Sequence, residues 1–444
     1  MADPGPPSNH PVIAPYFRKA LASRLGRRLL KPGFVRNVGI LAGGTAFAQI
    51  LAAAAMPLLT RLYTPDEFGT LAVFMSLTTV FAVVANLRLD LAIPIPKSDT
   101  IANLLLVTAL ASTVLISGTL LIGALAMPVS IAGWLGRPQL APYLWLVPVS
   151  IFLAAAYTSL QFWASRHKLF PLITYTRLTR AAGGVGAQVA LGFAGLSAAG
   201  LLIGQVLYNG LGVIAIGRRA TASVVAAFRN WSWKRWRLSL HRYKKFPQFT
   251  MPEALANTAG AELPLILIAI YAGGAEAGYV LLIVRLMGIP MGLVGGSVAQ
   301  VFLSDAGAKF RDGTLGHFTR RAMLVLAAIG APPLIIAGLA SPYVFPWLFG
   351  VEWQRAGDLV IWFVPWFALQ FIVSPVSSTL HIAGKNGLAF SLQIFGLAMR
   401  TFPIFFLIFY NLDFNLSIVF AMCSGFFYLV YIVVLYTLTI GARP

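Results

Sequence analysis

Long apolar runs separated by short polar turns make up the chain from residue 35 to its C-terminus. Most runs hold about 20 residues or more, which lets a helix rising 1.5 Å per residue cross a hydrocarbon core about 30 Å thick. No polar stretch between them is long enough for a soluble domain. The pattern predicts an all-α polytopic membrane protein with about twelve transmembrane helices, at residues 35–59, 67–88, 100–127, 141–165, 170–193, 198–217, 250–272, 276–302, 322–342, 357–381, 386–410 and 416–440.

Composition and charge agree with a membrane protein. Hydrophobic residues make up 58% of the chain and charged residues 10%, against roughly 25% charged residues in soluble domains. The net charge of +20 would suggest nucleic acid in a soluble protein. With the N-terminus placed in the cytoplasm, however, the opposite loops hold only Arg61, Arg137 and Arg355. This positive-inside distribution predicts a multi-pass protein of the bacterial inner membrane with both termini cytoplasmic, in contact with anionic phospholipids and not with nucleic acid.

Two cytoplasmic segments mix basic residues with large apolar ones. In residues 14–31 apolar side chains recur every four positions, which predicts an interfacial helix; residues 224–246 are rich in Trp and Arg. The alternative for both is an ordinary solvated basic loop. The predicted organisation is a basic amphipathic N-terminal segment, a first lobe with six spans, a basic Trp-rich linker and a second lobe with six spans, at residues 1–34, 35–217, 218–249 and 250–444.

The two halves also resemble each other. The segments that start at Pro57 and at Pro264 both read proline, tyrosine, an acidic residue, glycine and an apolar span. Because each half holds an even number of spans, such repeats have the same orientation and are related by an axis near the membrane normal. This arrangement predicts alternating access between two lobes.

Four arginines are predicted at bilayer depth, where each charge costs about 2.5–3.5 kcal/mol on insertion scales. A guanidinium binds two phosphate oxygens at once and stays charged at any pH, so an arginine-rich interior favours an anionic substrate group. We therefore predict a diphosphate-binding role for these side chains; the alternatives are snorkelling and structural ion pairing. The four are Arg177, Arg180, Arg285 and Arg400.

Five further charged residues are candidates for coupling or gating. Glu262 lies two residues before Pro264, and a proline can bend a helix and free a carbonyl for an ion. We predict that Glu262, with Glu253 as a second candidate, couples transport to a proton or sodium ion; a permanent salt bridge is the alternative. Arg61, Arg88 and Asp90 lie at span ends as gate or interfacial residues.

Signs of catalysis and of cofactors do not occur in the sequence. No two histidines have metal-ligand spacing, and the glycines near residue 184 follow no strand, so they predict no dinucleotide site. We find no nucleophile motif. We therefore expect no enzyme activity, no metal site and no cofactor other than a coupling cation.

Several segments resemble a known family. GTAFAQILAAAAMPLLTRLYTPDEFGTLAVFMSL followed by RLDLAIPIPKSD, within residues 37–99, resembles the opening of bacterial Wzx-type oligosaccharide flippases. KKFPQFTMPEALANTAG and LFGVEWQRAGDLVIWFVPW are similar to the same family. These flippases form the polysaccharide transport family of the MOP superfamily, which also contains the MATE exporters and the lipid II flippase.

The resemblance implies a MATE-like fold with two six-helix lobes around a central cationic cavity. It implies a flippase that moves an undecaprenyl-diphosphate-linked oligosaccharide from the inner to the outer leaflet, driven by an ion gradient, for a surface polysaccharide such as O-antigen. Other polysaccharide assembly proteins are candidate partners. The resemblance assigns no individual role to any of the arginines.

Two other functions remain as alternatives. A drug or metabolite antiporter of the same superfamily would share the fold, but a cavity for cationic drugs should be acidic. A membrane enzyme such as an O-antigen ligase or polymerase would bring arginine-bearing loops to the periplasm, where this sequence has short loops with few basic residues.

Overall fold

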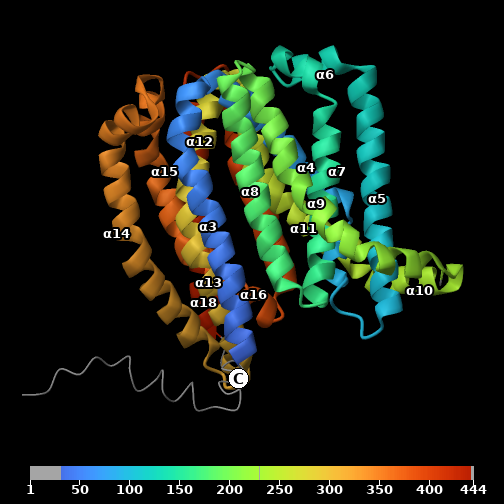
Figure 1. Ribbon diagram of the computed structural model, residues 1–444. Coiled ribbons are helices and arrows are strands. Elements are labelled where there is room, and N and C mark those ends of the chain that lie inside the picture. Colours follow the sequence, from blue (N-terminus) through green and yellow to red (C-terminus); the bar gives the residue numbers. More distant parts are fainter. Residues whose placement is uncertain (1–31, 230, 442–444) are drawn as a thin grey trace, which may run out of the picture.

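The computed structural model describes residues 32–229 and 231–441 as a bundle of long, roughly parallel helices (Figure 1). The first half consists of α3 (Pro32–Leu62), α4 (Pro65–Ala85), η1 (Leu89–Ala92), α5 (Asp99–Ala126), α6 (Pro128–Trp134), η2 (Pro138–Tyr143), α7 (Leu146–Arg166), α8 (Phe170–Phe193) and α9 (Ser197–Arg229). The second half consists of α10 (Trp233–Tyr243), η3 (Phe246–Thr250), α11 (Met251–Tyr271), α12 (Gly274–Pro290), η4 (Met291–Gly295), α13 (Gly296–Arg311), α14 (Leu315–Phe349), η5 (Val351–Trp353), α15 (Gln354–Val373), η6 (Ser374–Val376), α16 (Thr379–Ile382), α17 (Asn386–Phe409) and α18 (Leu416–Gly441).

Within the described residues, 11 helices are long and apolar enough to cross a membrane. The remaining predicted span, residues 170–193, is helix α8, which is more polar because it carries Arg177 and Arg180. It lies between α3 and α9 and packs extensively on both (Figure 1). The prediction of an all-α, multi-pass membrane protein is therefore confirmed.

Several helices are longer than their apolar runs. Helix α9 continues to Arg229, so residues 218–229, which we expected in the linker, extend a span instead. No glycine or proline ends the helix between Arg218 and Arg229. Helix α14 likewise exceeds the predicted span 322–342 at both ends. The interfacial helix predicted at residues 14–31 lies outside the described residues.

Most helices pack against others of the same half, and α4 is the main exception. It packs on α7 and α9 in the first half but makes its most extensive contacts with α12 and α11 of the second half. Apolar side chains of both halves merge into one buried cluster around this contact, among them Phe68, Leu71 and Leu282. Helix α4 therefore joins the two halves.

At the upper end of the bundle in Figure 1, the two halves touch through their backbones. A Cβ atom at Gly69 of α4 would lie 2.0 Å from the carbonyl oxygen of Gly274. One at Gly278 of α12 would lie 1.9 Å from the carbonyl oxygen of Pro65. Only glycine permits this approach, and we call the contact of these four residues the upper seal.

Polar and aromatic side chains close around the upper seal. Arg137 is 3% exposed, and its Nη1 donates to Asp66 Oδ1 at 2.7 Å. Trp353 is fully buried, donates from Nε1 to the carbonyl oxygen of Thr60 at 3.0 Å, and meets the Phe68 ring edge-on at 4.9 Å between centroids. Trp353, from the second half, therefore ties the two halves together at the upper end, while the Arg137–Asp66 bond stabilises the first half beside the seal.

The close contact at the upper seal predicts different stabilities for alanine substitutions at two glycines, Gly118 and Gly69. A Cβ at Gly118 of α5 meets nothing within 4 Å, so Gly118→Ala should keep or raise the melting temperature, since alanine is the better helix former by up to about 1 kcal/mol. Gly69→Ala makes the same chemical change against a backbone oxygen and should cost about 1–3 kcal/mol. Thermal unfolding in detergent measures both. Equal melting temperatures for the two variants would contradict the tight contact.

Candidate functional site

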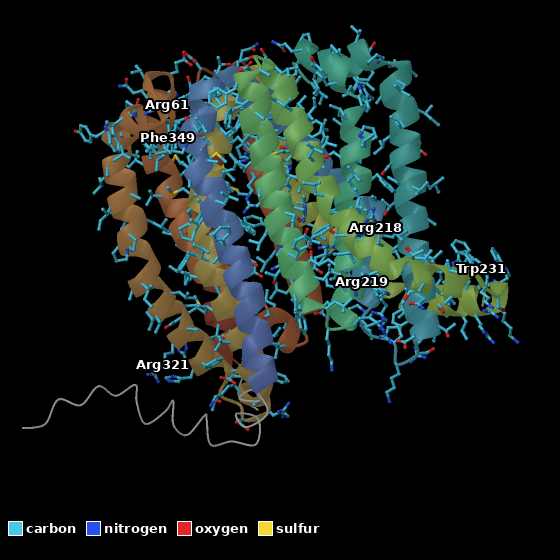
Figure 2. All side chains as sticks on the ribbon, in the orientation of Figure 1. Arg61, Arg218, Arg219, Trp231, Arg321 and Phe349 are labelled. Atoms are coloured by element: carbon cyan, nitrogen blue, oxygen red, sulfur yellow. The ribbon has the colours of Figure 1, made fainter. Side chains whose placement is uncertain are left out.

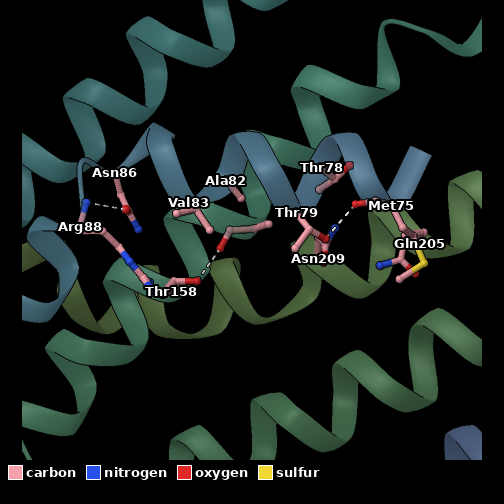
Figure 3. Close-up of a pocket in the computed structure, with 11 residues that line it drawn as sticks. Met75, Thr78, Thr79, Ala82, Val83, Asn86, Arg88, Thr158, Gln205 and Asn209 are labelled. Atoms are coloured by element: carbon pink, nitrogen blue, oxygen red, sulfur yellow. Dashed lines mark hydrogen bonds between the residues drawn. The ribbon is translucent and has the colours of Figure 1, made fainter. Parts of the chain in front are cut away.

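A furrow of about 210 Å³, lined by both polar and apolar side chains, runs along α4, between α7 and α9 (Figure 3). Its walls carry hydroxyl and amide groups, a methionine and one arginine, and none of its described lining residues is acidic. The lining residues are Met75, Thr78, Thr79, Ala82, Val83, Asn86, Arg88, Ala154, Thr158, Gln205 and Asn209.

The helical repeat of α4 produces the long wall of the furrow. Met75, Thr79, Ala82 and Asn86 follow one another at intervals of three or four residues, which places them on one face of the helix. The Thr79 hydroxyl donates to the carbonyl oxygen of Met75 at 2.8 Å. A threonine bonded in this way keeps its oxygen as an acceptor for a ligand.

The lower end of the furrow is formed where α4 stops. Leu87 and Arg88 both have left-handed backbones, with φ of 54° and 55°, and the backbone N–H of Arg88 donates to Asn86 Oδ1 at 3.1 Å. Two successive left-handed residues end the helix and turn Arg88 toward Thr158 (Figure 3). The Nε of Arg88 is buried and has no hydrogen-bond partner in the described part of the chain.

Asp90 follows Arg88 in the 3-10 turn η1 and is fully buried. Burial raises the pKa of Asp90, while the nearby Arg88 guanidinium and the backbone N–H groups of Asp90 and Leu91 act in the lowering direction. Arg61, the third candidate gate residue, is exposed near the upper end of α3 (Figure 2). Arg88 and Asp90 therefore lie together, and Arg61 lies at the other end of the bundle.

Two charged side chains of the second half reach α4 at successive residues. Arg285 of α12 donates from Nη2 to the sulfur of Met75, which lines the furrow. Glu262 of α11 accepts a hydrogen bond of 2.7 Å from the Ser76 hydroxyl through Oε2. The structure therefore brings one predicted anion-binding residue, Arg285, and one predicted coupling residue, Glu262, to the same turn of α4.

The two arginines of α8 tie that helix to its neighbours. Arg177 donates to the hydroxyl of Thr45 on α3. Arg180 donates from Nε to the carbonyl oxygen of Tyr208 at 2.6 Å, and its guanidinium lies 3.7 Å from the Tyr157 ring centroid and 4.4 Å from that of Tyr208. Its Nη2 also approaches Asn209 Oδ1 at 3.5 Å, so Arg180 supports the α9 side of the furrow.

Arg400 and Glu253 lie elsewhere in the second half. Arg400 is 2% exposed, and its guanidinium lies 4.4 Å from the Phe427 ring centroid. Its Nε has no hydrogen-bond partner in the described part of the chain. Glu253, near the start of α11, lies 3.6 Å from His381 Nε2. Neither residue lines the furrow.

The sequence interpretation did not identify the hydroxyl and amide groups of the furrow. A signal was present, because Thr79 and Asn86 share a face of α4, and Gln205 and Asn209 are four residues apart on α9. Threonine and asparagine are common in membrane helices as packing residues, so the pattern alone did not distinguish a binding wall. No group of three His, Cys, Asp or Glu side chains that could hold a metal occurs among the described residues.

Solved structures share this fold. The chain is similar to lipid II flippase MurJ in an inward closed conformation, with a TM-score of 0.71, 15% identity, and coverage of 89% of this chain and 86% of that chain. It is also similar to an inward-facing multidrug resistance MATE transporter of the MOP superfamily (TM-score 0.63, 15% identity, 88% and 93% coverage). A third similar structure is a MOP superfamily transporter from Pyrococcus furiosus (TM-score 0.59, 14% identity, 92% and 96% coverage).

At this level of identity the structural similarity shows the fold alone. The similar structures named here are described as two transporters and a flippase. No curated protein sequence matches the chain. Residues 58–358, more than half of the chain, match the family model described as polysaccharide biosynthesis protein. The chain belongs to this polysaccharide biosynthesis protein family, with the fold of the MOP superfamily.

Proposed function

We propose that the protein is a Wzx-type flippase of the bacterial inner membrane that translocates an undecaprenyl-diphosphate-linked oligosaccharide. The observation that carries this proposal is the furrow with Arg88 at one end and Arg285 at Met75 near the other. The wall between them offers hydroxyl and amide groups. Guanidinium groups suit a diphosphate, and hydroxyl and amide side chains suit sugar hydroxyls.

The length of the furrow agrees with a head group of this kind, while its volume of about 210 Å³ requires it to widen on binding. From Met75 to Asn86, 11 steps along α4 at 1.5 Å each span about 16 Å. This length accommodates a diphosphate and the first sugars, while the polyprenyl chain stays in lipid. Arg285 is the main diphosphate ligand in this proposal, with Arg88 at the inner end. The other three arginines do not contact the diphosphate in this proposal but add positive charge to the interior, because each is held by neighbouring side chains. They are Arg177, Arg180 and Arg400.

The orientation follows from the distribution of charge. The positive-inside rule assigns the lower end of Figure 1 to the cytoplasm. The upper seal then faces the periplasm, so the head group enters from the inner leaflet. Rocking of the two halves breaks the seal and opens the furrow outward. A membrane potential that is negative inside favours the export of an anion by about 2.3 kcal/mol per charge per 100 mV.

A drug or metabolite antiporter is the second candidate function, because a MATE multidrug transporter is among the structures with a similar fold. The charge of the furrow argues against cationic drugs, since its described lining holds an arginine and no acid. The family description, polysaccharide biosynthesis protein, and the similarity to a lipid II flippase both favour a lipid-linked glycan.

Substitution of Arg88, which lines the furrow, and of Arg285, which contacts it through Met75, tests the proposal. Arg285→Gln and Arg88→Gln should each lower the rate of translocation of a fluorescent undecaprenyl-diphosphate oligosaccharide in proteoliposomes at least about tenfold, equivalent to 1.4 kcal/mol, because each removes a charged ligand of the diphosphate. Arg219→Gln is the matched control, since Arg219 is an exposed arginine of α9 outside the furrow. It should keep the wild-type rate.

Each variant is first checked for folding by its melting temperature. Failure of the wild type to move any lipid-linked glycan, together with uptake of a small drug, would replace the flippase by the antiporter. Transfer or polymerisation of sugar by the wild type would instead favour the membrane enzyme.

Glu262 gives a separate test of ion coupling. In this proposal its carboxyl takes up a proton or sodium ion at the bond to Ser76. Glu262→Gln keeps a hydrogen-bonding group of the same size but cannot change its charge. Translocation by this variant should therefore no longer respond to an imposed proton or sodium gradient, while still responding to membrane potential. Glu253→Gln serves as the control and should retain the response to the gradient. A gradient response in Glu262→Gln equal to that of the wild type would assign Glu262 a purely structural role.

A further inference from the structure

A second, larger cavity lies in the other half of the molecule, between α14, α15 and α18. Its volume is about 610 Å³, which lies within the range of ligand pockets. Helix α14 forms its longest wall and lies at the edge of the bundle (Figure 1). The lining residues are His317, Arg320, Arg321, Met323, Leu324, Ala327, Ile372, Ile432 and Tyr436. We call this cavity the α14 groove.

The lower part of the α14 groove is basic. His317, Arg320 and Arg321 all lie in the first two turns of α14, which begins at Leu315. None of the described lining residues is acidic. The N-terminus of a helix also carries partial positive charge, which adds to that of the arginines. Figure 2 shows Arg321 at the lower end of the bundle.

Arg320 is held in place but not fully satisfied. Its guanidinium lies 5.6 Å from the centroid of the Tyr436 ring on α18. Its Nε is buried and has no hydrogen-bond partner in the part of the chain that the structure describes. A buried donor without a partner is costly, so a shift of the Arg320 side chain toward an anionic group in the groove would gain an acceptor.

The rest of the α14 groove is apolar. Met323, Leu324 and Ala327 continue along α14 to about 9 Å beyond Arg321, at 1.5 Å per residue. Ile372 and Ile432 line the groove from α15 and α18. Leu324 is 71% exposed, so this wall faces outward. The groove therefore has a basic part at the lower end of the bundle and an apolar part closer to the middle of its height.

We propose that the α14 groove binds one anionic phospholipid of the inner leaflet. The phosphate lies against Arg320, Arg321 and His317, and an acyl chain fills the apolar part between α14 and α18. Charge complementarity supports this occupant, because inner-leaflet lipids present negative phosphates at the depth where basic side chains end a span. The groove uses α14, α15 and α18, whereas the furrow uses α4, α7 and α9, so the lipid site does not depend on the proposed transport activity.

A pair of neighbouring arginines in the other half provides a matched control. Arg218 and Arg219 on α9 are exposed and adjacent in sequence, as Arg320 and Arg321 are adjacent, but they do not line the α14 groove (Figure 2). Native mass spectrometry of the detergent-purified protein with added phosphatidylglycerol or phosphatidylcholine measures how much lipid each variant retains. The wild type should retain one phosphatidylglycerol with at least about tenfold preference over phosphatidylcholine.

The double variant Arg320→Gln/Arg321→Gln should lose this preference, while Arg218→Gln/Arg219→Gln should keep it. Ala327→Trp gives a second test that leaves all charges in place. Its indole should fill the apolar part of the groove and lower phosphatidylglycerol retention about tenfold. Melting temperatures without added lipid identify any variant that fails to fold. If either Arg320→Gln/Arg321→Gln or Ala327→Trp fails to fold, lipid retention by the remaining one of these two variants tests the proposal.

Three results would overturn the proposal. Equal loss of phosphatidylglycerol in both double variants would mean general attraction to basic surface. Unchanged retention in a folded Arg320→Gln/Arg321→Gln or Ala327→Trp variant would exclude the α14 groove. Displacement of phosphatidylglycerol by an equal concentration of undecaprenyl diphosphate would make the groove a site for the transported lipid instead.

Discussion

The backbone contact between α4 and α12 is the constraint on which the arrangement of the molecule depends. Lipid offers no hydrogen bonds to the backbone, so each half consists of helices that satisfy their own polar groups. Helices of this kind associate closely only where small residues let their backbones approach. Gly69 and Gly278 provide that approach, and Arg137 and Trp353 surround it with buried polar and aromatic contacts. The position of α4 between the halves follows from this contact.

The buried arginines show two ways in which a membrane protein holds a charge. Arg180 and Arg400 lie against aromatic rings, where the negative faces of the rings offset the charge without a carboxylate. Arg285 has only the weak acceptor sulfur of Met75 as its hydrogen-bond partner in the described contacts. A weakly bonded guanidinium such as that of Arg285 is better suited to an anionic ligand, because an arginine already held by its neighbours would have to give up those contacts.

The sequence predicted the spans well because length and hydropathy determine them locally. The predicted span 170–193 is a helix, α8, but with its two arginines it is not among the helices apolar enough to cross a membrane. Helix ends were predicted less well, because α9 continues beyond its apolar core with a sequence that still favours a helix, and α14 continues past Pro342 and Pro346 in spite of these prolines. The charged residues were identified one by one, but their partners were not. Ser76 and Glu262 are 186 residues apart, and only the packing of α4 on α11 brings them together.

The contacts of α4 also connect the proposed binding and gating events physically. Gly69 lies six residues before Met75 and seven before Ser76, about 10 Å along one rigid helix. Under the proposed function, diphosphate binding draws on Arg285 and so weakens its contact with Met75, and cation uptake changes the charge of Glu262 beside Ser76. Both events alter the attachment of α4 to the second half. Because the same helix carries Gly69 in the upper seal, a change in either attachment biases the seal toward opening. The coupling therefore needs only α4 itself and not a chain of contacts through the rest of the protein.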